Sequence, residues 1–198
     1  MNWKATIPPT IILLGFLSVI YIIWIEEFQY YQTISDSSVL PVNEKLNLDF
    51  LEANNSPSYL HFFSEDCRNS RINIHHIDRI IEKNKGNVDF YIINVSNLSS
   101  EVLRKKYDVP AFVKIIHDPS AQVAAQLNVV SSPYALVISQ DQTLFFGGNY
   151  NNKNGLCGAN EINRSSPAIA LDFLLKNNNP PLFPNHQLSF SGCSINQS

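Results

Sequence analysis

The feature that most constrains the fold is an alternation of strand-type and helix-type segments between residues 58 and 176. Short apolar runs rich in β-branched and aromatic residues predict strands, and isoleucine or leucine at three- and four-residue spacing predicts helices. The predicted strands are residues 58–64, 87–95, 111–117, 134–139 and 144–148, and the predicted helices are residues 67–86, 99–109, 118–129 and 167–176. The order βαβαβαββα predicts an α/β fold, with a parallel sheet, helices on both faces and a C-terminal antiparallel hairpin.

Two of the predicted helices begin with a cap residue followed by proline. The pairs are Asp118–Pro119 and Ser166–Pro167. Proline suits the first helical position because its missing N–H would have no partner there. The pattern therefore predicts helices that start at Pro119 and at Pro167.

An apolar, uncharged run of 19 residues extends from Ile7 to Ile25. As a helix it is about 28 Å long, at roughly 1.5 Å per residue, which is enough to cross the hydrocarbon core of a bilayer. Lys4 precedes the run and two glutamates follow it, so the positive-inside rule predicts a cytoplasmic N-terminus. A cleavable signal peptide is the alternative, but no small-x-small cleavage site follows the run. We expect one uncleaved transmembrane helix in the inner or plasma membrane.

The rest of the chain divides by composition. Residues 1–6 form the cytoplasmic end, and residues 26–56 are a polar tether with a short helix around residues 44–52. The α/β domain spans residues 57–177, and an irregular tail covers residues 178–198. We expect everything after residue 25 to lie in the periplasm or an equivalent extracytoplasmic space.

The charge and the cysteine count limit the partners. A net charge of −3 without a basic stripe argues against nucleic-acid binding. The cysteines, Cys67, Cys157 and Cys193, match no zinc-ligand spacing, and the five histidines are scattered, so we expect no metal and no cofactor. An exported domain permits disulfides, and an odd count leaves one thiol unpaired.

Three segments and one proline carry a family resemblance. The segments are "HFFSEDC" at 61–67, "IHDPSAQVAAQLNVVSSP" at 116–133 and "YALVISQDQTLFFGG" at 134–148. In this order they resemble the thioredoxin fold of membrane-tethered TlpA/ResA-type proteins and peroxiredoxins. The resemblance covers residues 57–177. It implies a reactive cysteine at the end of the first segment and a cis-proline, Pro133, that faces its sulfur.

Cys67 is the candidate nucleophile. A cysteine at a helix N-terminus meets unpaired backbone N–H groups and the positive end of the helix dipole, both of which favour the thiolate. Arg68 adds a nearby cation, whereas Glu65 and Asp66 oppose the thiolate. A buried, inert cysteine is the alternative, but a strand-to-helix corner favours a reactive one.

Ser70 gives the site a CxxS motif. The related enzymes usually carry a second cysteine there, whose thiol resolves the mixed disulfide, and a hydroxyl cannot do this. Ser70 can still donate a hydrogen bond to the Cys67 thiolate. Cys67 therefore acts as a monothiol, is resolved by a distant cysteine, or has lost its redox function.

His61 lies six residues before Cys67, where thioredoxins hold a buried acid that relays protons. A histidine could do the same with a pKa closer to neutrality. The favoured alternative is a half-buried strand histidine that is hydrogen-bonded to a carbonyl.

Two disulfides compete for the remaining cysteines. The loop that leads to Cys157 leaves the predicted hairpin beside Pro133, so a Cys67–Cys157 bridge could resolve the reaction. The tail is also long enough to bring Cys193 to Cys157. We favour Cys157–Cys193 as a structural bridge, because an irregular tail without its own core commonly needs one.

These residues predict thiol–disulfide exchange through Cys67 with protein thiols or disulfides, and with a membrane redox partner. The backbone of Ser132, together with Pro133, would hold an extended substrate segment by strand-like hydrogen bonds. A redox-inactive thioredoxin-fold adaptor that uses the same groove is the first alternative.

A thiol peroxidase is the weaker alternative. Ser64 fits the hydroxyl that peroxiredoxins carry three residues before the peroxidatic cysteine. Leu60 stands where that family has a proline, and no activating arginine is evident.

Overall fold

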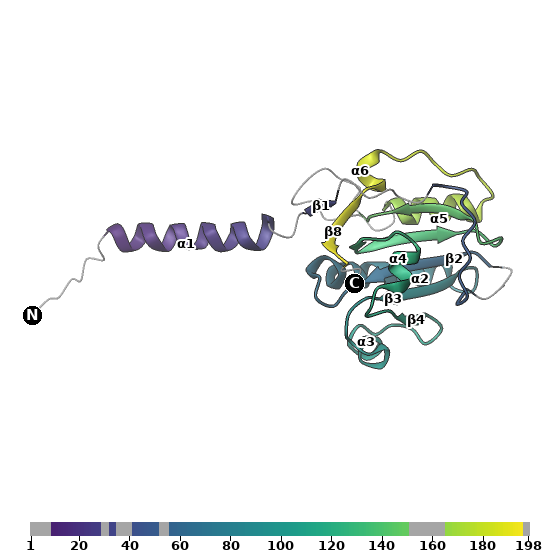
Figure 1. Ribbon diagram of the computed structural model, residues 1–198, viewed down its shortest axis with the longest axis horizontal. Coiled ribbons are helices and arrows are strands. Elements are labelled where there is room, and N and C mark those ends of the chain that lie inside the picture. The colour runs from purple at the N-terminus through teal and green to yellow at the C-terminus, as the bar shows by residue number, and fades with distance from the viewer. Residues whose placement is uncertain (1–8, 29–31, 35–40, 52–55, 151–164, 196–198) are drawn as a thin grey trace, which may run out of the picture. The chain divides into compact units, whose positions relative to one another are not determined.

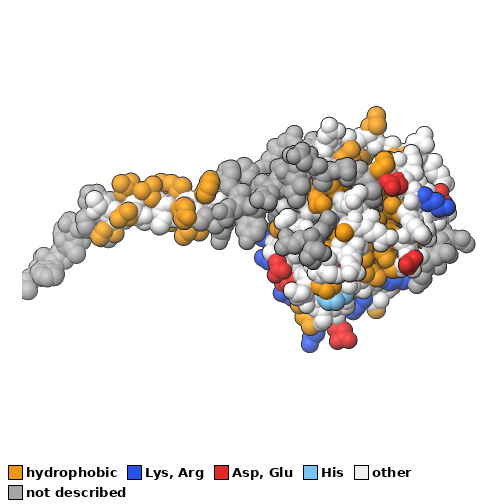
Figure 2. Space-filling view, in the orientation of Figure 1, with side chains coloured by type: hydrophobic (Ala, Val, Ile, Leu, Met, Phe, Trp, Pro, Cys, Tyr) orange, Lys and Arg blue, Asp and Glu red, His pale blue; other side chains and the backbone are white. Residues whose placement is uncertain are grey.

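The computed structural model describes residues 9–28, 32–34, 41–51, 56–150 and 165–195. The chain forms two compact units, Met1–Gln32 and Thr33–Ser198. The first contains helix α1 (Pro9–Phe28) (Figure 1). Its described apolar side chains, Ile11 and Phe16 among them, are exposed (Figure 2). Within the described part of the chain, no helix combines the length and the hydropathy needed to cross a membrane.

The second unit is built on a five-stranded mixed sheet in the order β4-β3-β2-β6-β7. Its strands are β2 (Ser58–Phe63), β3 (Asp89–Asn94), β4 (Lys114–His117), β6 (Tyr134–Ile138) and β7 (Leu144–Gly148). Strands β2, β3 and β4 are parallel, and the β6–β7 hairpin pairs antiparallel with β2. The predicted α/β fold, which combines parallel strands with a terminal antiparallel hairpin, is confirmed.

Helices lie on both sides of this sheet. They are α2 (Arg68–Asn84), α3 (Ser100–Lys106), α4 (Gln122–Gln126) and α5 (Ser166–Leu175). Side chains alternate along β2, so Tyr59 and Phe63 enter one core with α2 and α5, while Leu60 and Phe62 enter a second core with α4. Because both faces of β2 are covered, all six of its residues are buried, and the strand ends inside the domain just before Cys67.

The start of α4 differs from the sequence prediction. The helix begins at Gln122 rather than at Pro119, and Ala121 before it has a positive φ of 55°. Asp118 nevertheless caps the helix, because its carboxylate accepts hydrogen bonds from the backbone N–H groups of Gln122 (2.7 Å) and Ala124 (3.1 Å). The start predicted near Pro167 is confirmed, since α5 begins at Ser166 and contains that proline in its first turn.

Part of the predicted tether belongs to the domain. Leu46, Leu48 and Leu51 are buried in the second core, and Lys45 forms a β-bridge with Thr143. The helix predicted around residues 44–52 is absent from the described residues 41–51. The predictions of a tether and of a helix were wrong for these residues, because the leucines pack against the sheet instead of lining one face of a helix.

The tail predicted to be irregular is also ordered. It contains α6 (Asn185–Leu188) and β8 (Phe190–Ser194). Strand β8 lies between β1 (Gln32–Ile34) and β5 (Ser131–Ser132) in a second, three-stranded sheet. Phe190 is buried against Tyr134, with ring centroids 4.5 Å apart, and the Tyr134 hydroxyl donates a hydrogen bond to the Leu188 carbonyl (3.1 Å). Specific packing therefore fixes the tail on the domain.

Candidate functional site at the Cys67–Cys193 disulfide

Cys67 lies at the corner where β2 gives way to α2. It is the N-cap of α2 with extended backbone angles, and its carbonyl accepts the first helical hydrogen bond, from the Arg71 N–H (3.1 Å). Its own N–H donates to the Ser64 carbonyl (3.2 Å), which closes the turn. The predicted position at a helix N-terminus is confirmed, and the residue is fully buried.

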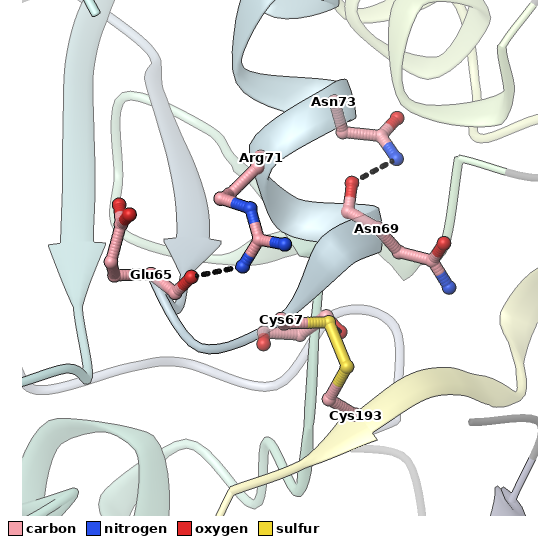
Figure 3. Close-up of a disulfide and its surroundings, with 7 residues drawn as sticks. Glu65, Cys67, Asn69, Arg71, Asn73 and Cys193 are labelled. Carbon is pink, nitrogen blue, oxygen red and sulfur yellow. Dashed lines mark hydrogen bonds between the residues drawn. A yellow bond between two sulfur atoms is a disulfide. The ribbon is translucent and has the colours of Figure 1, made fainter. Parts of the chain in front are cut away.

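The sulfur of Cys67 is bonded to the sulfur of Cys193, 126 positions further along the chain (Figure 3). The two Cα atoms are 5.8 Å apart. This bond corrects both predicted pairings, Cys157–Cys193 and Cys67–Cys157, since each needs a sulfur that is already engaged. Cys157 itself lies outside the described residues. The predictions failed because they treated the tail as irregular, whereas β8 carries Cys193 directly to the N-terminus of α2.

Cys193 reaches this place through backbone pairing with β5. In the antiparallel ladder Cys193 is opposite Ser132 and Ser194 is opposite Ser131. The ladder continues with the Ile195 N–H, which donates to the carbonyl of Val130 (2.8 Å).

Ser132 also lies against the sulfur of Cys67. Its carbonyl oxygen is 3.3 Å from Cys67 Sγ, and the Ser132–Pro133 peptide bond is cis, as the family resemblance implied. The residues predicted to hold a substrate thus lie beside Cys67, and the chain's own tail pairs with Ser132.

Several polar atoms near these elements are buried without a hydrogen-bond partner among the described residues. They are Ser70 Oγ, Ser131 Oγ, Ser132 Oγ and His61 Nε2. Ser70 is fully buried in the first turn of α2, so the CxxS hydroxyl is enclosed by the protein. In the disulfide state it does not hydrogen-bond to Cys67. A thiolate formed on reduction would need a donor, and an unpartnered hydroxyl could become one.

His61 is fully buried, and its environment differs from both predicted ones. Its Nδ1 is 2.7 Å from the hydroxyl of Tyr150, which in turn lies 2.9 Å from the hydroxyl of Tyr59. Burial lowers the pKa of His61 from 6.5 to about 3, so the ring is neutral near pH 7. The near-neutral pKa expected of a proton relay was therefore wrong. The predicted half-burial and carbonyl partner were wrong as well, because tyrosine hydroxyls fill this place.

The negative charge of Glu65 is stabilised by partners that lie away from the disulfide. Its carboxylate accepts hydrogen bonds from Lys106 Nζ (2.6 Å) and from the Tyr107 hydroxyl (2.7 Å). Burial alone would raise the pKa of Glu65, but these hydrogen bonds and the Lys106 charge lower it overall. Its carbonyl accepts a hydrogen bond from Arg71 (2.6 Å), and its side chain points away from Cys67 (Figure 3). Glu65 therefore opposes a Cys67 thiolate less than its sequence position suggests.

A separate cavity of about 740 Å³ lies near the other end of β2. Ser56 and Pro57, which precede the strand, line it together with Asn87 and Asp141. Cys67 follows the same strand, so this cavity is not part of the disulfide site. Within the described ranges, no group of three or more histidine, cysteine or acidic side chains is arranged to hold a metal ion.

Solved structures of other proteins share the fold of this chain. No protein-family model and no curated protein matches the chain. A solved hypothetical protein from Sinorhizobium meliloti is 17% identical with a TM-score of 0.61, over 72% of this chain and 80% of that one. An uncharacterized conserved protein from Geobacillus kaustophilus is 19% identical with a TM-score of 0.59, over 84% and 94%. At these identities the two structures show a shared fold only.

A third solved structure is more distantly similar. It is a secreted disulfide oxidoreductase from Mycobacterium tuberculosis, 18% identical with a TM-score of 0.40 over 46% of this chain and 68% of that one.

Proposed function

We propose that the protein is a membrane-anchored thiol–disulfide exchange protein whose redox pair is Cys67 and Cys193. The observation that carries the proposal is the bond between these two sulfurs at the N-terminus of α2. The helix end supplies unpaired N–H groups and a positive potential to one sulfur of the pair. Cys193 therefore takes the resolving role that Ser70, three residues after Cys67, cannot perform.

The two sulfurs have different tasks in the two half-reactions: the oxidised protein is reduced by attack on Cys193, and the reduced protein acts on its substrate through Cys67. Cys67 is fully buried, while Cys193 is half-buried, so an incoming thiolate attacks the sulfur of Cys193. The Cys67–Cys193 bond breaks, a mixed disulfide forms on Cys193, and Cys67 leaves as the thiolate. A leaving thiolate of lower pKa departs faster, and the α2 N-terminus favours that charged state. A second thiolate then releases Cys193, which leaves both cysteines reduced.

The expected partners are protein thiols or disulfides and a membrane redox partner on the same side of the membrane. The apolar, uncharged sequence of residues 7–25 supports the anchor, and the excess positive charge before it supports an extracytoplasmic domain. A stable disulfide is also consistent with an oxidising compartment.

A redox-inactive adaptor is the second candidate, and one observation favours it. Cys67 is fully buried, and the tail around Cys193 is held by the β5–β8 ladder and by the packing of Phe190. A disulfide so enclosed could serve only to staple the tail to the domain. In an exchange protein the disulfide of the native state reacts with thiols, whereas in an adaptor it does not.

Equilibration with glutathione distinguishes the two functions. The full chain with Cys157→Ser, which removes the third cysteine, is incubated in buffers of varied ratios of reduced to oxidised glutathione. Free thiols are then alkylated in acid and counted by mass spectrometry. Exchange predicts a reversible titration of Cys67 and Cys193 without loss of native circular dichroism. Reduction only after denaturation would establish the adaptor, and sulfenic acid formation at Cys67 with added peroxide would favour the peroxidase.

A further inference from the structure

The segment around Cys193 lies where a substrate of Cys67 would have to lie. A sulfur that exchanges with Cys67 must approach it beside the Ser132 carbonyl, which is 3.3 Å from Cys67 Sγ. Cys193 does this as the residue opposite Ser132 in an antiparallel ladder. An extended peptide that pairs with a short exposed strand is a common mode of protein recognition.

Gly192 makes the contact that most restricts which residue can precede the cysteine. Its φ is +140°, a conformation that residues with a side chain rarely adopt. A Cβ atom on Gly192 would overlap the Ser132 carbonyl oxygen and would lie 2.9 Å from the Ser132 carbonyl carbon. These are rigid backbone atoms, so they cannot move aside as the end of a flexible side chain would. Only glycine fits directly before the cysteine in this register.

The rest of the tail is held independently of Cys193. Leu188 accepts a hydrogen bond from the Tyr134 hydroxyl, and the ring of Phe190 packs against the same tyrosine. The side-chain amide of Asn149 donates a hydrogen bond to the carbonyl of Ser189 (2.8 Å). Residues 191–195 can therefore leave Ser132 while the chain up to Phe190 stays in place.

We propose that β8 is a built-in occupant of the substrate groove, which the backbone of Ser131 and Ser132 and the ring of Pro133 form. The groove accepts extended segments in which glycine directly precedes the reactive cysteine. Substrates are then protein disulfides with a Gly-Cys sequence on an exposed extended segment, which take the place of Gly192 and Cys193. The proposal deepens the proposed exchange function and rests on it.

The reaction balances with one substrate disulfide. In the reduced protein the Cys67 thiolate attacks the sulfur of the substrate's Gly-Cys segment, and the other substrate sulfur leaves as a thiolate. The tail then returns, and the Cys193 thiolate attacks Cys67 Sγ. This step re-forms the Cys67–Cys193 bond and releases the second substrate thiolate. Two electrons pass from the protein to the substrate, and the two thiol protons of the protein end on the substrate cysteines.

Synthetic peptides test the selectivity. The full chain with Cys157→Ser and Cys193→Ser retains Cys67 as its only thiol. Two six-residue probes, FSGCSI and FSACSI, carry thionitrobenzoate on their cysteine, and attack by Cys67 releases coloured thionitrobenzoate. The first probe has the sequence of residues 190–195. We expect it to react at least about tenfold faster than the alanine probe, because the added methyl group meets the Ser132 backbone.

Adding Gly192→Ala to this chain tests whether β8 occupies the substrate groove. The substitution should displace the tail segment and speed the reaction with the glycine probe, whereas Ser194→Ala, at an exposed position of the same strand, should not. If the Gly192→Ala chain does not fold, the ratio of the two probe rates in the chain that keeps Gly192 still decides selectivity.

Dithiobis(nitrobenzoate), a disulfide without a peptide part, distinguishes failure of the groove proposal from failure of the exchange function. Reaction of Cys67 with this reagent but equal rates with both probes would overturn the Gly-Cys groove and leave the exchange function standing. No reaction with any of the three reagents would overturn the exchange function itself.

Discussion

Cys193 lies directly opposite Ser132 in the antiparallel ladder between β8 and β5. Ser132 is also the residue whose carbonyl lies against the Cys67 sulfur. Backbone pairing with Ser132 thus places Cys193 beside Cys67. The same ladder places Gly192 against the Ser132 carbonyl, so one backbone contact sets both the redox partner and the selectivity proposed for the groove.

Loss of the disulfide should destabilise the domain. In the chain-entropy view, a bond between residues 126 positions apart contributes about 3–5 kcal/mol by restricting the unfolded chain. We expect Cys193→Ser to lower the free energy of unfolding by this amount in urea denaturation under oxidising conditions. The wild-type chain with a reductant should unfold with the variant, and Ser194→Ala should unfold with the oxidised wild type. Equal stability of all four samples would contradict a disulfide in the folded protein.

The buried His61 should make stability depend on pH. Its pKa is about 3 in the folded protein and 6.5 in the unfolded chain, so the unfolded state binds the extra proton first. The stabilisation is complete above about pH 6.5 and is lost as the pH falls toward 3, at up to ~1.4 kcal/mol per pH unit. His61→Gln should flatten the plot of unfolding free energy against pH in this window. His75→Gln changes an exposed histidine and should keep the wild-type slope.

Asp66 should tune the reactivity of Cys67. In the reduced protein we expect the alkylation rate of Cys67 to show an apparent pKa below the ~8.5 of a free thiol, because the residue caps α2. Asp66→Ala removes an adjacent negative charge and should lower this pKa further. Glu82→Ala removes the same charge near the far end of α2, beyond a Debye length of about 8 Å, and should leave the value unchanged. Equal shifts in both variants would mean that the net charge, rather than the neighbouring carboxylate, sets the reactivity.

The anchor predicts where the protein is found. Residues 7–25 should remain on the mature chain and carry it into the membrane fraction, from which detergent but not high salt should release it. Replacing Leu13 and Leu17 by arginine should prevent this association, because charges at the centre of a membrane helix are costly. Recovery of a mature N-terminus beyond residue 25 would show a cleaved signal peptide instead.

Much of the fold could be predicted because it depends on local patterns. The two-residue alternation of β2 and the spacing of Ile74, Ile77 and Ile81 along α2 both reflect which side of an element faces the core. The corner between β2 and α2 follows from those patterns, and with it the position of Cys67. Asp118 shows the limit of this approach, since its capping role was predicted correctly but the helix starts later than Pro119 suggests.

The sequence by itself determined the α/β order and the corner that holds Cys67, whereas the place of Pro133 beside it was implied by the family resemblance. Only the tertiary structure decided the partner of Cys67, because a pairing across 126 positions depends on the packing of Phe190 and on the β5–β8 ladder, which leave no local pattern. It also decided the state of His61. A pKa near 3 follows from complete burial, and the segments that bury His61, Tyr150 among them, are distant in sequence and meet only in the folded domain.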